Sequence, residues 1–364
     1  MKLNTTQPIL AFDGQDDVIP DSLSAAVFVG DSLWVASDEV TSVERLSSAD
    51  GITFGNHKSF PLRDLLDLPA QGTEFDQEID IEGLDHNDSY LWLVGSHSIK
   101  RKKVDNDGGP TDKKIRKLAK TEIEGNRFLL ARVPLIENAN QELVRSIADP
   151  NNPQHTLTAG QLAGDTRSNA LSDAIKHAES GHGDSHLVAF LTIPGKDNGF
   201  DIEGLAVSGD RVFMGLRGPV LRGWAVILEV SVTPDDPFRL KLKEIGPDGR
   251  QYRKHFLDLN GLGVRDICVD GDDLLVLAGP TMNLDGPVAV FRWRGALGSS
   301  AEQLVFSDGL ERVFDVPSRA GHDHAEGMAL VTDPKRLLIV YDSPSEERKI
   351  SDRAVKADVF ELPD

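Results

Sequence analysis

Three glutamates recur in closely related motifs at widely separated positions of the chain. Glu82 and Glu203 each lie in the pentapeptide Asp-Ile-Glu-Gly-Leu, and Glu326 lies in the similar segment His324-Ala-Glu-Gly-Met328. If the three side chains converge, their carboxylates suit a hard cation, and calcium, with about 6–8 oxygen ligands, fits them better than zinc. The alternative is structural, because a carboxylate that accepts backbone N–H bonds from a neighbouring segment locks the two segments together.

A second set of polar residues follows the apolar run after each motif. Aligning the copies places Asp38, His97, Arg217, Gly279 and Asp342 at equivalent positions. Their chemistry differs from copy to copy, as expected where a ligand pocket is tailored, whereas packing positions stay apolar. We therefore predict that the polar members of this set bind a ligand.

Three arginines are candidate anion ligands. Arg217 and Arg222 lie in a segment rich in Gly and Pro, and Arg265 occupies the glutamate column in another copy of the repeat. A guanidinium group suits bidentate recognition of phosphate or carboxylate. The alternative is ion pairing with the many acidic residues of this chain.

Two histidines flank Asp323 shortly before Glu326. His322 and His324, two residues apart in an extended segment, would point to the same side, where they could chelate a transition metal or supply a general base. Ordinary hydrogen bonds in a loop are the alternative. If the protein is an enzyme, the candidate catalytic residues are His324, as a general base, and Arg217, as a ligand of an anionic group. The sequence contains no Gly-x-Ser-x-Gly motif and no phosphate-binding Gly-x-x-x-x-Gly-Lys-Ser/Thr loop, so it indicates no nucleotide cofactor.

The motifs are parts of a longer internal repeat. Each is followed, across a short polar turn, by an apolar run typical of a β-strand, and degenerate copies extend the glutamate column to positions 24, 82, 203, 265 and 326. The steps are 58, 121, 62 and 61 residues. A fixed recurrence of strands favours radial repetition over a β-sandwich. The expected fold is therefore an all-β propeller.

The step of 121 residues either hides a further blade or contains an insertion. Residues 100–120 are polar and basic, and residues 158–178 resemble a short helix. We therefore expect five blades, with six as the alternative, and a helical and polar insertion around 100–180. Within the single domain, residues 136–185 are expected to form an insertion with a short helix. The runs at 127–134 and 186–192 look like strands, and a strand at 357–362 could close the ring against one at 9–12.

Composition limits the classes of function. The chain has 364 residues without a linker-like segment, which predicts a single domain over 1–364. It carries 39 Lys and Arg against 59 Asp and Glu, so a broad nucleic-acid surface is not expected. Neither a signal peptide nor a membrane span is evident, which predicts a cytoplasmic protein. The basic residues 100–120 are either a solvated segment or a contact for an acidic partner or nucleic acid.

The chain resembles a bacterial family known only as domain of unknown function thirty-six-sixteen. The resemblance rests on Phe200-Asp-Ile-Glu-Gly-Leu-Ala206, Gly215-Leu-Arg-Gly-Pro-Val-Leu-Arg-Gly-Trp224, Val264-Arg-Asp-Ile267 with Leu277-Ala-Gly-Pro280, and His322-Asp-His-Ala-Glu-Gly-Met328. More distantly, the chain is similar to propellers of the phytase-like esterase and lactonase type. These resemblances imply a propeller with a divalent metal in its channel, although Arg265 departs from a uniform ring of acids.

Two functions remain open from the sequence. The first is binding of a small molecule or protein partner at the face of a central channel, without catalysis. The second is a calcium-dependent hydrolase of small phosphate, ester or lactone substrates, in which the three glutamates hold the cation.

Overall fold

The repeated motif begins the first strand of an antiparallel pair in each copy. The structure is a computed structural model that describes residues 5–13, 18–70, 77–104, 108–136 and 141–362. The first strands are β3 (Leu23–Val29), β7 (Ile81–Asn87), β16 (Asp201–Ser208), β21 (Gly263–Asp270) and β26 (His324–Thr332). They pair with β4 (Ser32–Ser37), β8 (Tyr90–Gly95), β17 (Arg211–Leu221), β22 (Asp273–Gly279) and β27 (Lys335–Asp342).

Further strands extend each pair outward. They are β5 (Ser42–Ser47) and β6 (Thr53–Pro61), β11 (Leu130–Ile136) and β15 (Gly160–Leu162), β18 (Trp224–Asp236) and β20 (Arg253–Asp258), β23 (Val288–Trp293) and β25 (Leu310–Val316), and β30 (Asp358–Glu361) and β1 (Thr5–Thr6). In addition, β19 (Arg239–Leu242) pairs with both β18 and β15 and so joins two neighbouring sheets.

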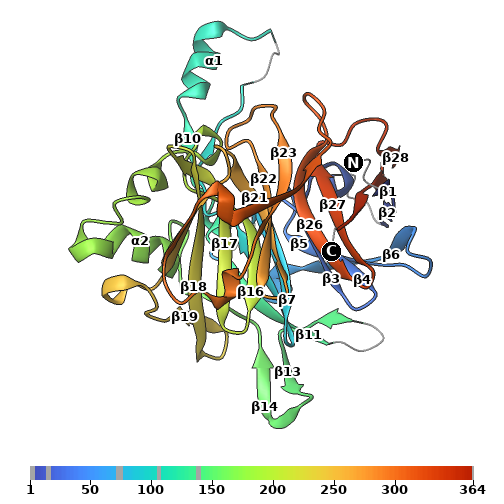
Figure 1. Cartoon of the computed structure of the whole chain (residues 1–364), viewed down its shortest axis with the longest axis horizontal. Helices are drawn as coiled ribbons and strands as arrows, with labels where there is room; N and C mark the ends of the chain where they lie inside the picture. Colours follow the sequence, from blue (N-terminus) through green and yellow to red (C-terminus); the bar gives the residue numbers. More distant parts are fainter. Residues whose placement is uncertain (1–4, 14–17, 71–76, 105–107, 137–140, 363–364) are drawn as a thin grey trace.

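The first strands lie next to one another around a common centre. β3 contacts β7, β7 contacts β16, β16 contacts β21, β21 contacts β26, and β26 contacts β3. The chain is therefore mostly β, with curled sheets in a propeller-like arrangement (Figure 1). Many central strands are buried along their whole length, which explains their nearly continuous apolar sequences.

The strand that closes the last sheet differs from the predicted one. Strand β30 pairs with β1 (Thr5–Thr6), whereas β2 (Ile9–Ala11) pairs with β29 (Ala354–Lys356) and with β6. Leu10 and Phe12 are buried in a cluster between the first and last sheets, and the exposed Thr5 and Thr6 occupy the edge. The apolar N-terminal strand is thus buried, and the polar strand lies at the exposed edge of the sheet, as is usual for such side chains.

The predicted strand at 186–192 is also wrong. This segment contains the 3₁₀-helix η4 (Val188–Thr192). The Asp184 carboxylate accepts hydrogen bonds from the backbone N–H groups of His186 and Leu187, and its carbonyl accepts one from Val188. A capping aspartate therefore starts a helical turn despite the β-branched and aromatic composition that follows.

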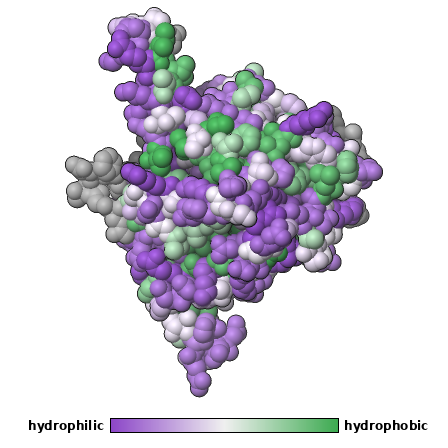
Figure 2. All heavy atoms as spheres, turned by 90° about the vertical axis from the view of Figure 1, so that its left-hand side faces the viewer, coloured by the Kyte–Doolittle hydropathy of each residue, from purple (hydrophilic) through white to green (hydrophobic). Residues whose placement is uncertain are grey.

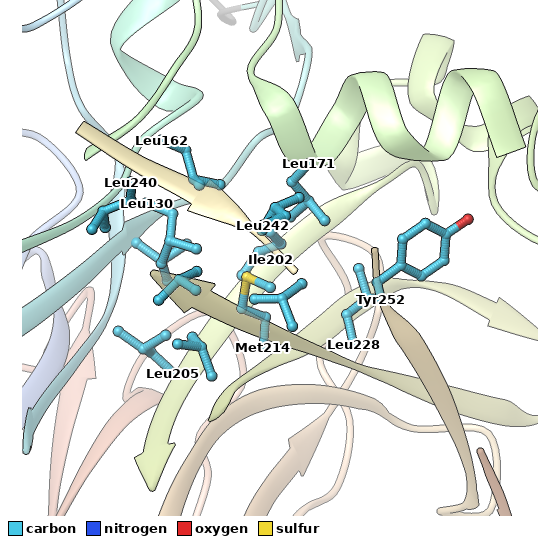
Figure 3. Packing of buried hydrophobic residues seen from close by; sticks show 14 of the residues in the cluster. Leu130, Leu162, Leu171, Ile202, Leu205, Met214, Leu228, Leu240, Leu242 and Tyr252 are labelled. Atoms are coloured by element: carbon cyan, nitrogen blue, oxygen red, sulfur yellow. The ribbon is translucent and has the colours of Figure 1, made fainter. Parts of the chain in front are cut away.

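The long insertion adds two helices on the outside of the sheets. Helix α2 (Ala170–Gly181) begins at Asn169, whose side chain accepts hydrogen bonds from the N–H groups of Leu171 and Ser172. Leu171 and Ile175 are buried, and Figure 3 shows Leu171 reaching into the same apolar cluster as Ile202 and Met214. A helix is therefore present in the second half of the predicted segment 158–178 and packs on the core, whereas Gly160–Leu162 in its first half form strand β15.

Helix α1 (Thr111–Leu118) behaves differently. It has no buried residue, and Ile115 and Leu118 are exposed. It projects from the body of the molecule (Figure 1), and Figure 2 shows polar and apolar atoms mixed on this projection. The basic segment thus contributes nothing to the described core. None of the helices in the described residues is long and apolar enough to cross a membrane.

The remaining elements are short. The strands are β9 (Lys100–Arg101), β10 (Thr121–Glu122), β12 (Glu142–Leu143), β13 (Ser146–Asp149), β14 (Asn152–Thr158), β24 (Gln303–Val305) and β28 (Lys349–Ser351). The other 3₁₀-helices are η1 (Ile19–Asp21), η2 (Leu62–Asp64), η3 (Gly125–Arg127), η5 (Gly195–Asp197), η6 (Pro247–Gly249), η7 (Ala296–Gly298) and η8 (Ser307–Gly309).

Candidate functional site: a carboxyl cluster at the centre of the first strands

The glutamate column coincides with an irregularity in every first strand. The pairing register between the first and second strands shifts at this position in each sheet, as in a β-bulge. The residues at the shift are Ser24, Glu82, Glu203, Arg265 and Glu326, and all five are buried. A bulge leaves one residue unpaired and re-aims its side chain. The repeat therefore turns one side chain per sheet away from the regular pleat.

The glycine after each glutamate allows neighbouring first strands to approach closely. A Cβ atom on Gly204 would lie 2.8 Å from Cα of Asp266 in β21, and one on Gly327 would lie 2.8 Å from Cα of Ala25 in β3. Both distances are shorter than atoms without a bond between them tolerate. The Glu-Gly pair thus combines an inward carboxyl group with a backbone contact to the next sheet.

Aspartates perform the locking role that the sequence suggested for the glutamates. The Asp85 carboxylate of β7 accepts a hydrogen bond from Val207 N in β16 (2.5 Å), and Asp266 of β21 accepts one from Met328 N in β26 (2.7 Å). Burial raises the pKa of Asp85 to about 7 and the pKa of Asp266 well above its usual range. These bonds join adjacent first strands directly.

Two arginines neutralise part of the glutamate set. Arg265 Nη1 lies 2.5 Å from Glu203 Oε2 and 3.2 Å from Glu326 Oε1. Arg217 donates to the other Glu203 oxygen, and its Nη2 lies 3.2 Å from Asp201 Oδ2. The predicted residues Glu203, Glu326, Arg217 and Arg265 are therefore brought together, although as ion pairs with one another rather than around a free site.

Glu82 has no such partner. Its side chain is 8% exposed, and it makes no hydrogen bond or ion pair with any described residue. Burial raises its pKa well above the usual range, and the carboxylates of Asp80, Glu203, Glu326 and Asp38 act in the same direction. Glu82 is thus a buried carboxyl group whose pKa is raised by burial and by other carboxylates, and its charge in turn raises the pKa of Arg217.

Asp38 is the second carboxyl group without a partner. It follows β4, and its buried Oδ1 has no hydrogen-bond partner among the described residues. Burial raises its pKa to about 8, with further contributions from the charges of Asp80, Glu326 and Asp342. These contributions place Asp38 in the same cluster as Glu82.

Asp342 and His324 interact at the rim of the cluster. His324 Nδ1 lies 3.8 Å from Asp342 Oδ2, and this interaction raises the pKa of His324 and lowers that of Asp342 against the opposing effect of burial. The expected pairing of His324 with His322 is wrong, because Asp323 adopts a left-handed backbone (φ 56°) and His322 belongs to a turn with Arg319. Because the backbone is not extended at Asp323, the rule that side chains two residues apart point to the same side does not apply to His322 and His324.

His97 lies outside the carboxyl cluster. Its Nδ1 lies 2.8 Å from the carbonyl oxygen of Gly95, and its Nε2 lies 2.7 Å from the side-chain nitrogen of Asn169. Burial lowers its pKa to about 4, so the ring is neutral. Both nitrogens are engaged, and His97 holds the start of α2 against the sheet instead of facing the centre.

Arg222 is also separate from the cluster. It is exposed in the turn between β17 and β18, with a left-handed backbone (φ 51°), and it forms no ion pair with a described residue. Anion binding by Arg222 therefore stays a prediction without a second group to support it. Gly279 is the residue equivalent to Asp38 and His97 in the copy of the repeat that contains Arg265. It leaves space for Arg265, because a Cβ atom at position 279 would lie 3.2 Å from Arg265 Cγ.

Sequence reasoning missed three members of the cluster. Asp80 forms an ion pair with Arg127, and Asp201 pairs with Arg217. Lys196, in η5, has no ion pair among the described residues. Burial and Arg217 lower its pKa, but Glu326, Asp80 and Glu203 raise it overall. The identical pentapeptides could have identified Asp80 and Asp201, whereas nothing in the repeat pointed to Lys196.

The three predicted calcium ligands do not form a metal site as they lie here. Both oxygens of Glu203 face arginines, and the Arg265 guanidinium lies between Glu203 and Glu326. Among the described residues no group of three or more His, Cys, Asp or Glu side chains could hold a metal ion. The donor set therefore does not fit calcium, which needs more oxygen ligands than remain. Calcium binding stays an untested prediction.

A separate cavity of about 680 Å³ lies beside β1. Its arginine and acidic lining residues are paired with one another, and Lys356 Nζ donates to the backbone carbonyl of Glu347. Arg348 lies 2.7 Å from Asp358 and 3.1 Å from Asp323, and Arg319 pairs with Glu347. The cavity therefore holds no acid without a cationic partner, in contrast to Glu82 and Asp38.

A family model covers nearly the whole chain. The model described as protein of unknown function DUF3616 matches residues 22–358. The chain belongs to this family. In this DUF3616 protein the match spans all five copies of the repeated motif, including the bulge residues.

Similar solved structures are propeller-like proteins. Glutaminyl cyclase from Myxococcus xanthus has 9% identity and a TM-score of 0.41, covering 99% of this DUF3616 chain and 97% of that chain. PQQ-bound aldose sugar dehydrogenase from Streptomyces coelicolor has 10% identity and a TM-score of 0.35, covering 98% of both chains. At such values the similarity does not extend to activity. No curated protein matches the chain.

Proposed function

We propose that this protein is a five-bladed β-propeller that binds a small polar ligand at the carboxyl cluster around its axis, without catalysing a reaction. The observation that carries the proposal is Glu82, a buried carboxyl group that has no partner among the described residues and whose pKa other carboxylates raise. Asp38 supports it as a second unpaired carboxyl group.

The blade number is supported by the contacts of the first strands. Strands β7 and β16 contact each other directly, and the bond from Val207 N to Asp85 joins them. A sixth first strand would have to separate these two. The long step in the repeat is instead filled by outer strands, α1 and α2.

An unpaired buried carboxyl group is costly to keep. A buried polar group that lacks a partner costs about 1–3 kcal/mol, and more when it is charged. Such groups are uncommon in folded proteins and concentrate where a ligand or a reaction supplies the missing partner. The first strands are already joined by Asp85, Asp266 and the Glu-Gly contacts, so Glu82 is not needed for that purpose.

Binding is favoured over hydrolysis because the cluster lacks an activated nucleophile. His324 interacts with Asp342 and lies 4.0 Å from Asp285, and no described Ser, Thr or Cys forms a hydrogen bond with it. A nucleophile with an adjacent base is the usual signature of covalent catalysis. The calcium-dependent alternative lacks a donor set that fits the ion.

The test is a ligand screen by thermal shift on three proteins: wild type, Glu82→Gln and Glu39→Gln. Glu39 is exposed and next to Asp38 in the chain, so its substitution matches the change in charge without touching the cluster. The panel contains neutral, anionic and cationic polar compounds. We expect at least one compound to raise the melting temperature of wild type and Glu39→Gln but not of Glu82→Gln, because a ligand of the native state stabilises it. Failure of every class to give a Glu82-dependent shift would refute the proposal.

A further inference from the structure

We infer that the ligand is an organic cation, with an ammonium or guanidinium group held by the unpaired carboxyl groups of Glu82 and Asp38. This inference rests on the proposed function and specifies the class of ligand. It is based on which charges of the cluster are compensated and which are not.

The arginines of the cluster are already committed to particular acids. Arg127 pairs with Asp80, and its Nε lies 2.7 Å from Glu124 Oε2. Arg217 forms ion pairs with Glu203 and Asp201, and Arg265 forms ion pairs with Glu203 and Glu326. None of these ion pairs includes Glu82 or Asp38. Glu82 therefore lacks a direct cationic partner, and the charge of Lys196 lowers the pKa of Asp38 only against the larger effect of burial.

The charged and titratable groups of the cluster come from the first strands and from the segments beside them. The acids are Asp38, Asp80, Asp201, Glu203, Glu326 and Asp342, and the cationic or titratable groups are Arg127, Arg217, Arg265, Lys196 and His324. Acids outnumber cations in this set. An anionic ligand would add to the repulsion between carboxylates, whereas a cation reduces it.

A metal ion is a poorer match than an organic cation. A metal needs several oxygens converging at about 2.0–2.6 Å, and the described residues offer no such group. Glu82 lies on β7 and Asp38 follows β4, so their carboxyl groups come from different sheets. An ammonium group has three N–H donors and a guanidinium has five, and each can reach carboxyl groups that are separated.

Lys196 shows that a primary ammonium group is compatible with this environment. It has no ion pair among the described residues, and Glu326, Asp80 and Glu203 favour its charged form. Its charge lowers the pKa of Asp38, but the two side chains form no ion pair. Lys196→Ala should therefore tighten binding of a cationic ligand, because it removes a like charge close to the site.

Binding should release protons. In the free protein burial raises the pKa of Asp38 to about 8 and the pKa of Glu82 well above its usual range, which favours the protonated form of both groups. A bound cation favours their ionised forms, and the displaced protons pass to the buffer. Affinity should thus rise with pH between about 6 and 8, by at most about tenfold per pH unit for each proton released.

The experiment uses three four-carbon probes that differ in charge: putrescine (dicationic), 1,4-butanediol (neutral) and succinate (dianionic). Calorimetric titration of the full chain, at constant ionic strength in two buffers with different ionisation enthalpies, gives both affinity and the number of protons released. We expect putrescine to bind with proton release, and butanediol and succinate to bind at least tenfold more weakly. Tetramethylammonium, which has no N–H donor, should also bind weakly.

Variants separate this site from general charge attraction. Glu82→Gln should lower putrescine affinity at least tenfold and reduce the proton release, whereas Glu39→Gln should change neither. Equal binding of putrescine by Glu82→Gln, or tighter Glu82-dependent binding of butanediol or succinate, would overturn the inference. In the second case the proposed function would still stand. If no compound of any class gave a Glu82-dependent effect, both would fail.

Discussion

Arg265 of β21 donates to Glu203 of β16 at 2.5 Å, across the boundary between two neighbouring sheets. The same guanidinium lies 3.2 Å from Glu326 in β26. One arginine in the glutamate column thus connects the acids of the sheets on both sides of it. The arginine at this position of the repeat therefore reduces the repulsion between the carboxylates of Glu203 and Glu326.

Arg265→Ala should destabilise the protein strongly near neutral pH. Removing one partner of a buried ion pair typically costs about 3–5 kcal/mol, because the other charge stays buried. The cost should fall near pH 5, where Glu326, with a pKa raised to about 7 mainly by burial, takes up a proton. Urea denaturation at both pH values measures it. The exposed Arg222→Ala is the control, with an expected change below about 0.5 kcal/mol. An equal loss in both variants would contradict the assigned role of Arg265.

Gly204→Ala tests the close approach of the first strands. Its Cβ atom would lie 2.8 Å from backbone Cα of Asp266, which has no flexible end to move away. We expect a loss of about 1–3 kcal/mol, as for overpacking. Gly55→Ala in β6 is the matched control, because nothing lies within 4 Å of a Cβ atom there. A Gly204 variant as stable as the Gly55 variant would show that the strands are not in such close contact.

The repeat made the first strands and the glutamate column predictable. Identical pentapeptides fixed the equivalence of Glu82 and Glu203, and the structure places both at the same register shift. The locking aspartates were not predictable, because Asp85 and Asp266 act at different positions relative to the bulge. His97 was misjudged because its environment depends on Asn169, which lies in an insertion and not in the repeat. Equivalence within the repeat therefore predicted where a residue lies in its sheet, but not which residue it hydrogen-bonds or pairs with.

Stability should decrease as the pH rises from about 4 to 8. The folded-state pKa values of Asp38, Asp201 and Glu326 are raised to about 8, 7 and 7, and burial is the main cause of each shift. The folded state then binds more protons than the unfolded state in this window, so the free energy of unfolding falls with increasing pH. Denaturation at about pH 5 and pH 8 should differ by more than about 1 kcal/mol. Higher stability at pH 8 would be inconsistent with these shifts.

Shortening a side chain should destabilise the protein strongly in α2 and hardly at all in α1. Leu171→Ala in α2 removes a fully buried side chain and should cost about 2–5 kcal/mol. Ile115→Ala in α1 removes a side chain that is 64% exposed, and stability should change by less than about 0.5 kcal/mol. Thermal denaturation compares the two variants. A large effect at Ile115 would mean that α1 packs against the body of the protein.

The protonation state of Glu82 is the most direct test of the central claim. Infrared difference spectra between wild type and Glu82→Gln at neutral pH isolate the C=O stretch of a protonated carboxylic acid at this position. We predict that this band is present in the free protein, because burial and neighbouring carboxylates raise the pKa of Glu82, and that it disappears when putrescine binds. A Glu82 that is already ionised without ligand and unchanged by putrescine would contradict the account.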